Sequence, residues 1–343
     1  MNNDYVLTNL GKAPEYYKET IKLIEDSFQY NSTQHFDEDF KNLLDPSNHQ
    51  HCLILIHKPT NVVAAHLAFT KNEMNKDKSS LPVVFIGGIA TNKEHRGKNL
   101  FRFLINYAIE ENKHAALFAL WSEITGLYEK FGFTQAGGLL ETGKNIINSN
   151  NIPNGFYKTG FNLISEGEFN EIKKLYNEEV FKKFFTIKRT ELNWSIIRSR
   201  TSCDLFIKKE NGKIISYFVL GKGKDLQNII HEFASEQPST INDINSFKLW
   251  LPEYYSGNYP NHQLFYTAFM KIGNVERLSQ FLSQTILHFG ELRKEKNELT
   301  FIFEGKEFNC TEEEFIRYII GPYPLEEFKS YKLSPYISGL DSI

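Results

Sequence analysis

Short apolar runs alternate with amphipathic stretches over the first 145 residues, and this alternation predicts a mixed α/β unit. Apolar residues at helical spacing among charges predict two helices, at 14–28 and 37–44. Apolar runs bounded by polar turns predict strands at 52–56, 62–69, 83–91 and 115–121. The polar stretch 71–80 is expected to be a loop between two of these strands.

The segment 83–133 is the most informative, because its strand is followed by a basic turn and then by a helix that begins at Leu100. The turn, 92–99, has the sequence Asn-Lys-Glu-His-Arg-Gly-Lys-Asn. Unpaired N–H groups of a first helical turn, the positive end of the helix dipole and flanking Arg or Lys side chains all attract a phosphate. This order of elements therefore predicts a pyrophosphate site at the start of the helix.

At these residues the chain resembles the GCN5-related N-acetyltransferase (GNAT) family. In that family an Arg-x-x-Gly-x-Gly/Ala loop holds the pyrophosphate of acetyl-CoA, the preceding strand contacts pantetheine, and a tyrosine protonates the departing thiolate. The resemblance makes Tyr128 the catalytic acid and implies cofactor contacts on the strand, in the loop and after the next strand. The implied cofactor residues are Ile89, Ala90, Thr91, Arg96, Gly97, Lys98, Asn99, Leu100, Phe101, Arg102 and Ser122.

Two residues of the loop depart from the family pattern. Asn99 stands where glycine is usual, and asparagine is the residue that best tolerates the left-handed conformations that glycine supplies. Phe101 replaces Gly or Ala, a change that matters if the phosphates pack against that side chain. The loop is similar to that of the enhanced-intracellular-survival (Eis) branch of the family, which has a large residue at this position.

The Eis branch also implies an unusual base, the terminal carboxylate of the chain, here Ile343, reaching back into the first unit. The tail 334–343 is rich in proline and apolar residues, so we expect it to pack against the protein. The alternative is a tail that only closes the C-terminal domain. Family likeness also implies a β-bulge near Gly88 that turns a backbone N–H toward the thioester carbonyl.

An acidic run and two histidines are further polar candidates in the first unit. The acidic run 37–39 could attract a cationic amine, or it could be a solvated helix start with favourable dipole placement. His66 and His114 are expected to be structural, since neither has an obvious partner in sequence.

A second unit follows an Asn-rich linker at 145–154 and has the pattern of a decayed copy of the first. Cys52 aligns with Cys203, an offset of 203 − 52 = 151 residues, and the strand–turn–strand pattern matches to within one residue. A candidate central strand at 229–234 is followed by Ser-Glu-Gln-Pro instead of a basic loop. The second unit is therefore expected to be a scaffold without cofactor, and the stretch from Arg189 to Trp194 resembles an Arg…Trp element of the Eis branch.

The chain thus divides into three predicted parts. These are a catalytic GNAT domain at 1–148, a degenerate GNAT-like domain at 155–262 and a small C-terminal α+β domain at 263–343. The last part is expected to hold a strand at 264–272, a helix at 275–287, a hairpin at 299–308 and a helix with a Thr311–Glu314 capping box. In the Eis branch a sterol-carrier-like domain occupies this place, but roughly 80 residues is short for one, so no lipid binding is inferred. The predicted fold class is a mixed α/β and α+β fold with tandem GNAT domains.

Composition narrows the function classes. A formal charge of −3 and a pI near 6.4 give no general attraction to nucleic acid. The chain has no apolar run of about 18 residues and no secretory signal at its start, which favours the cytoplasm and no membrane partner. Its three cysteines lack metal-ligand spacing and are expected to be reduced, and no metal is expected.

These features together predict an N-acetyltransferase that moves acetyl from acetyl-CoA directly to a primary amine of a small molecule or peptide. One alternative is a non-catalytic acyl-CoA-binding or regulatory protein on the same scaffold. Another is transfer of a longer acyl chain, or transfer to a thiol or hydroxyl acceptor. The aromatic content of 14% and the habit of the Eis branch favour self-association into a homo-oligomer.

Overall fold

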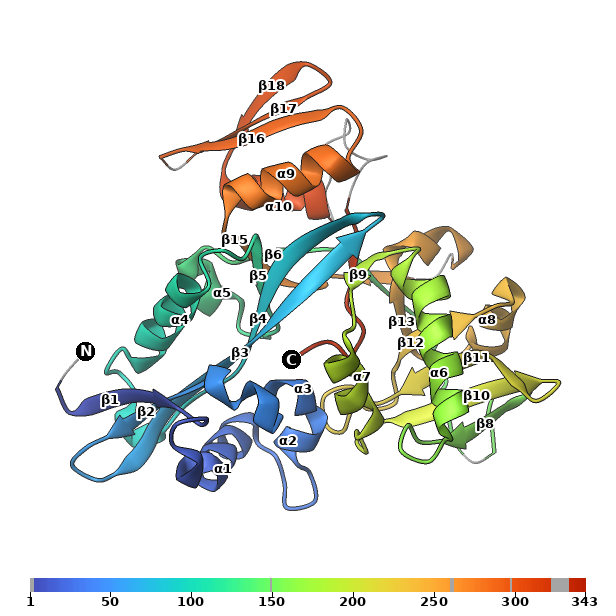
Figure 1. The fold of residues 1–343 in the computed structure, drawn as a ribbon, viewed down its shortest axis with the longest axis horizontal. Coiled ribbons are helices and arrows are strands. Elements are labelled where there is room, and N and C mark those ends of the chain that lie inside the picture. Colours follow the sequence, from blue (N-terminus) through green and yellow to red (C-terminus); the bar gives the residue numbers. More distant parts are fainter. Residues whose placement is uncertain (1–2, 149, 260–261, 297, 322–332) are drawn as a thin grey trace.

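The computed structural model describes residues 3–148, 150–259, 262–296, 298–321 and 333–343. Two large sheets with their helices lie side by side, and a small three-stranded sheet with two helices sits against the first of them (Figure 1). In the described residues no helix is both long and apolar enough to cross a bilayer.

The first sheet is built mainly from the N-terminal unit. Its strands follow the order β1 (Tyr5–Asn9), β2 (Cys52–His57), β3 (Val62–Lys76), β4 (Ser79–Thr91), β5 (Leu117–Leu120), β15 (Ala268–Ile272) and β6 (Thr134–Ala136). Helices α1 (Tyr17–Phe28), α2 (Phe36–Asp39) and α3 (Lys41–Leu44) pack on one face, and α4 (Leu100–Glu111) and α5 (Thr125–Tyr128) pack on the other. The expected helices at 14–28 and 37–44 are confirmed, with the second divided at Phe40.

The stretch 71–80 is not the predicted loop. Strands β3 and β4 continue through it as a hairpin, pairing from Lys71 and Val84 to Lys76 and Ser79, and the chain turns at Asp77, whose φ is +54°. Most side chains of this end of the hairpin are at least partly exposed, which makes a real strand polar on both faces. The stretch is polar because its side chains are exposed, and polar composition alone did not distinguish this exposed strand from a loop.

The second sheet is built mainly from the second unit. Its strands follow the order β14 (Gln263–Phe265), β7 (Leu139–Thr142), β13 (Leu249–Pro252), β12 (Ile230–Ser235), β11 (Lys213–Leu220), β10 (Asp204–Glu210) and β8 (Phe156–Thr159). Helices α6 (Glu166–Leu175) and α7 (Glu191–Arg198) cover one face. The predicted central strand is β12, and the β10–β11 hairpin matches the β2–β3 hairpin as the repeat requires.

Between β12 and β13 the second unit has a short 3-10 helix (Pro238–Thr240) and the four-residue helix α8 (Ile241–Ile244), where the first unit has the twelve-residue α4. No cationic loop precedes α8, since the chain runs from Ser235 through Pro238 directly into it. This part of the chain is fully described, and it offers no counterpart to the basic loop at 92–99 of the first unit.

Several described strands cross the boundaries predicted at 148 and 263, among them β7, β14 and β15. Strand β7 precedes residue 148 but pairs with β13 and β14 in the second sheet. Strand β15 follows residue 263 but lies between β5 and β6 in the first sheet. Local patterns identify a strand and not its partner, so this exchange between the units is not visible in the sequence.

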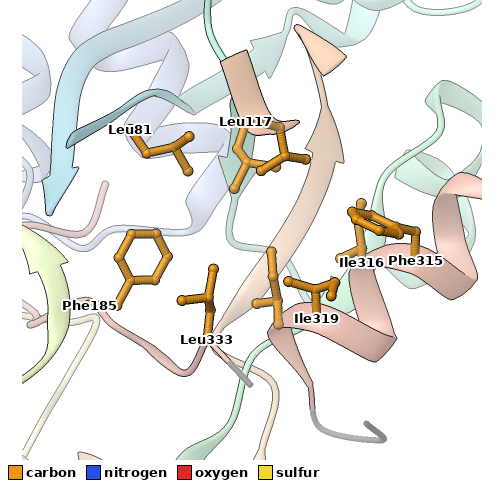
Figure 2. A pocket seen from close by; sticks show the side chains of 9 residues that line it. Leu81, Leu117, Phe185, Phe315, Ile316, Ile319 and Leu333 are labelled. Carbon is orange, nitrogen blue, oxygen red and sulfur yellow. The ribbon is translucent and has the colours of Figure 1, made fainter. Parts of the chain in front are cut away.

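The C-terminal α+β part contains α9 (Val275–Thr285), α10 (Glu312–Ile320) and a meander of β16 (Phe289–Glu295), β17 (Glu298–Phe303) and β18 (Lys306–Cys310). The predicted hairpin and the Thr311–Glu314 capping box are confirmed. Its helices enclose an apolar cavity with Leu81, Leu117 and Phe185 (Figure 2). The cavity holds about 10 Å³, so it is a packing defect and not a lipid site.

The described tail, 333–343, returns from this part to the centre of the molecule (Figure 1). Strand β19 (Pro335–Tyr336) pairs in parallel with β9 (Phe185–Ile187), which in turn pairs with the far end of β3. All residues of the tail except the partly exposed Ser334 are buried, so the expectation of a packed tail is confirmed.

Candidate active site

Strand β4 carries a β-bulge at Gly88 and Ile89. His66 of β3 is opposite Ala90 and Ala68 is opposite Gly87, so one residue of β3 faces two residues of β4. Gly88 has a φ of +59°, a conformation that favours glycine. The expected bulge is therefore present at the expected position.

His66 fixes the orientation of the bulge. Its Nδ1 lies 2.6 Å from the carbonyl oxygen of Gly88, which can only accept, so Nδ1 carries the proton. Because a trans peptide points its C=O and N–H in opposite directions, the N–H of Ile89 is directed away from His66. Complete burial lowers the pKa of His66 to about 4, against the opposing effect of this hydrogen bond, and the ring is therefore neutral at physiological pH.

The sequence offered no partner for His66, and the structure supplies one from across the sheet. The Nε2 atom of the same ring is buried and has no hydrogen-bond partner among the described residues. Leu43 packs closely as well, since a methyl group built on Gly88 would lie 3.2 Å from both His66 and Leu43.

Strand β4 extends well beyond the residues that pair with β5. The two strands pair in parallel from Val83 and Leu117 to Phe85 and Ala119, whereas β4 continues to Thr91. The predicted cofactor residues Ile89, Ala90 and Thr91 lie on this continuation. A strand that leaves its neighbour after the paired part offers backbone groups to an extended ligand between the two.

The predicted loop connects this strand end to α4 and is open to solvent. Arg96, Gly97, Lys98 and Asn99 are all exposed. Gly97 has a φ of +76° and Asn99 has a φ of +59°, so Asn99 does adopt the left-handed conformation expected of it.

The N-terminus of α4 has free hydrogen-bonding capacity. The first helical bond joins the N–H of Phe103 to the carbonyl of Asn99, and the Asn99 side chain does not cap the helix. In this fully described turn there is no acidic side chain. The N–H groups of Leu100, Phe101 and Arg102 therefore remain available for an anion at the positive end of the helix.

Two side chains of the first turn of α4 have clear positions. The Phe101 ring packs edge-on against Tyr128, with centroids 5.8 Å apart, and against Phe131 at 5.2 Å. It is thus directed toward α5, and the large residue supports the tyrosine. Arg102 is exposed and lines a polar groove of about 490 Å³ that continues to Lys271 and the start of α10.

Tyr128 and Ser122, two residues of the predicted site, interact in the structure. Burial raises the pKa of Tyr128, and a hydrogen bond with Ser122 partly offsets this shift. Ser122 follows β5, and its hydroxyl also accepts from the N–H of Ile124 at 3.0 Å. The phenol is consequently protonated at neutral pH and held by a side chain that the resemblance also singled out.

The carboxyl end of the chain reaches the same strand from the opposite face. A methyl group built on Gly87 would lie 3.3 Å from the carboxyl carbon of Ile343, so the terminus rests against the residue before the bulge. Ile343 itself is buried. The structure therefore brings Ile343 to the strand that carries Ile89.

The acidic run 37–39 is engaged in contacts within the protein. Asp39 is buried, accepts from the Tyr30 hydroxyl at 2.8 Å and accepts from the N–H of Lys224 in the second unit at 2.9 Å. Asp37 accepts from Tyr17 at 2.9 Å. Asp39 thus links the first unit to the second through a hydrogen bond. Neither interpretation of the acidic run predicted this role.

In the described part of the chain one group of potential metal ligands gathers, Glu25, His35 and Asp37, with ligand atoms within 4.8 Å of one another. Asp37 and Glu25 already accept hydrogen bonds from Tyr17 and from the N–H of Phe36. The three cysteines are free and buried, and burial raises the pKa of each thiol to about 12, as expected of reduced, unreactive residues.

Comparison with known proteins agrees with this geometry. Residues 12–136 match the family model described as an acetyltransferase (GNAT) domain. No curated protein matches the chain in sequence.

Solved structures resemble the chain over most of its length. A GCN5-related N-acetyltransferase from Anabaena variabilis is 12% identical with a TM-score of 0.63, over 99% of this chain and 100% of that one. Eis1 from Mycobacterium abscessus is 7% identical with a TM-score of 0.57, over 89% and 85% of the two chains. N-myristoyltransferase from Saccharomyces cerevisiae with bound myristoyl-CoA is 10% identical with a TM-score of 0.51, over 71% of each chain.

At these identities the structural likeness concerns the fold, and it extends across both units. The sequence match covers the strand, loop and helix that make up the site. Residues 12–136 therefore match the acetyltransferase (GNAT) domain model, and the fold of the whole chain resembles those of the GCN5-related N-acetyltransferase and of Eis1.

Proposed function

We propose that this protein is an N-acetyltransferase that moves the acetyl group of acetyl-CoA directly to a primary amine of a small molecule or peptide. The observation that carries the proposal is the position of the Ile343 carboxyl group against Gly87, next to the bulge that orients the Ile89 N–H. In this proposal the proton acceptor and the oxyanion donor both lie at the part of β4 that extends past its pairing with β5.

The loop supports the cofactor part of the proposal. A diphosphate at the N–H groups of Leu100, Phe101 and Arg102 would be flanked by the cations Arg96 and Lys98. From there the pantetheine chain would follow Thr91, Ala90 and Ile89 toward the bulge. The thioester carbonyl would then accept a hydrogen bond from the Ile89 N–H. His66 orients this N–H through its hydrogen bond to the Gly88 carbonyl of the same peptide.

In the proposed reaction the Ile343 carboxylate removes a proton from the amine, and the neutral nitrogen attacks the thioester carbon. A C–N bond forms, the nitrogen gives its second excess proton to water, the C–S bond breaks, and the sulfur leaves with the electron pair. Tyr128 donates its proton to that thiolate. Because the tyrosine pKa lies above 10 and a thiol titrates near 8.5, this transfer is uphill by at least about 2 kcal/mol unless binding lowers the tyrosine value.

Asn99 offers a test of the cofactor loop. A β-branched residue in the left-handed region costs about 1–2 kcal/mol, whereas glycine adopts it freely. We therefore expect Asn99→Val to weaken CoA binding roughly tenfold, and Asn99→Gly to bind as the unmodified protein does. Isothermal titration with CoA measures both, and equal affinity of the two variants would show that CoA does not use this loop.

The activity itself is tested by free-thiol release from acetyl-CoA with polyamines, aminoglycosides and lysine-containing peptides as acceptors. Butyryl-CoA and myristoyl-CoA belong in the same panel, because the fold also serves the yeast N-myristoyltransferase. We expect amine-dependent release from acetyl-CoA that saturates in both substrates. Absence of turnover with every acceptor, together with absence of CoA binding, would refute the proposal.

The proposed setting is the cytoplasm, where thiols stay reduced, and the three free, buried cysteines agree with this setting. No nucleic acid or membrane partner is proposed. Self-association into a homo-oligomer remains part of the proposal, and light scattering measures it.

A further inference from the structure

Three buried cations of the second unit contact the three residues that precede Ile343. Arg189 binds the Asp341 carboxylate through Nε and Nη2, at 2.9 and 2.8 Å. Lys222 contacts the hydroxyl of Ser342 at 2.9 Å and its carbonyl at 3.3 Å. Arg200 extends Nη2 to the carbonyl of Leu340 at 3.5 Å.

These cations are shielded from water. The side chains of Arg189 and Lys222 have 0% exposure, and Arg200 is 1% exposed as a residue. A buried charge is costly unless it is paired and hydrogen-bonded, so each contact with the tail satisfies a group that water does not reach.

The remaining contacts of the cations anchor them in the protein. Arg189 also binds Glu232 of β12, with Nη1 to Oε1 at 3.0 Å, and stacks on the Tyr176 ring with its guanidinium carbon 3.8 Å from the centroid. Lys222 pairs with Asp225 at 3.2 Å and lies 4.1 Å from the centroid of the Phe40 ring. The cations are therefore held from the protein side and present fixed donors to the tail.

Further contacts hold the tail before and beside the three cations. The Tyr336 hydroxyl donates to the carbonyl of His231, and Thr186 donates to the carbonyl of Tyr336, both at 2.7 Å. From the first unit, Asn42 donates to the carbonyl of Asp341 at 3.2 Å. The tail is thus fixed between the two units up to its last residue.

We propose that the second unit serves as a seat that positions the Ile343 carboxylate, with Arg189, Arg200 and Lys222 as its positioning residues. The inference rests on the proposed function of that carboxylate as the base. Chain ends normally fray, and a catalytic group has to be held within about 0.5 Å of its productive place. The second unit has no basic loop of its own before α8. Its role in the proposed reaction is to hold residues 340–342, and thereby the carboxylate of Ile343.

The inference is tested with Lys222→Met and Asp341→Asn, two substitutions that keep the shape of the side chain and remove its charge. The matched control is Lys213→Met, the same substitution on β11 of the same unit, where the lysine pairs with Glu236 and does not touch the tail. All are made in the full chain, and thermal melting identifies a variant that fails to fold.

Two readouts are measured, kcat with acetyl-CoA and an amine, and the rate at which carboxypeptidase Y releases Ile343. We expect both test variants to lower kcat at least roughly tenfold with CoA affinity kept within about twofold, and to release Ile343 faster than the control does. In a chain that ends at Ser342, adding Lys222→Met should change kcat less than about twofold, because the group it positions is gone.

Control-like kcat and control-like release in both test variants would overturn the inference. Additive losses of kcat from Lys222→Met and from the shortened end would overturn it too, because Lys222 would then act independently of the terminus. A protein that protects Ile343 through Lys222 but acetylates no amine would instead refute the proposed function, and it would limit the second unit to holding the tail.

Discussion

Replacing Tyr128 by Phe is expected to lower kcat roughly 100-fold or more while CoA affinity changes less than about twofold, as loss of a general acid predicts. Phenylalanine keeps the edge-on contacts of the ring with Phe101 and Phe133. It removes only the hydroxyl that bonds Ser122. The departing thiolate would then have to take its proton from water.

Tyr107→Phe is the matched control. Tyr107 is a partly buried tyrosine of α4 whose ring stacks on Phe103 with centroids 6.3 Å apart, away from the proposed site. Steady-state kinetics and CoA titration on both variants separate the two positions. A Tyr128→Phe protein as active as Tyr107→Phe would exclude Tyr128 as the acid.

Conversion of the terminal carboxylate to a carboxamide is expected to reduce kcat by a factor of about 100 or more, because an amide of the same shape cannot accept the amine proton. The change is made by ligating a synthetic C-terminal peptide that ends in Ile343 amide. The buried tail contacts of Asp341 and Ser342 stay in place, so the stability and the CoA affinity should be nearly unchanged.

The control for this experiment is the same ligated protein with the natural carboxylate. Gly87→Ala gives a second view, because its methyl group would lie 3.3 Å from the carboxyl carbon and should displace it by a few tenths of an ångström. If the amide form turned over acetyl-CoA as fast as the ligated control, another group would have to serve as base.

The local part of the site was predictable because its chemistry lies in one short segment. The basic turn, the helix start at Leu100 and the left-handed conformation of Asn99 follow from residue types in sequence. Phe101 could not be placed from the loop alone, since its role depends on Tyr128, which is 27 residues later by numbering (128 − 101). The resemblance pointed to both residues but not to their contact.

The long-range part of the site was predictable only where a family resemblance reached it. The return of the tail was expected from the Eis branch, whereas Lys222 carries no signal in sequence because its partner Ser342 lies 120 residues away. His66 is a similar case. Its role depends on a bulge in the neighbouring strand, and a lone histidine in an apolar run does not reveal that contact.

The sheets show the same limit for the fold. A hydrophobic run located β15 as part of the strand predicted at 264–272, whereas β7 was not predicted as a strand. The exchange of these strands between the two sheets depends on tertiary packing. The prediction of a loop at 71–80 was wrong for a different reason. The polar end of the β3–β4 hairpin is exposed, so it lacks the apolar pattern that identifies a strand.

The central claim is that the diphosphate of an acyl-CoA binds where α4 begins. A crystal structure of the protein with CoA tests this most directly. We predict density for the diphosphate at the N–H groups of Leu100, Phe101 and Arg102, with the thiol near the bulge at Gly88 and within reach of Tyr128. CoA bound elsewhere, or a loop closed by the Phe101 ring at saturating CoA, would contradict the account.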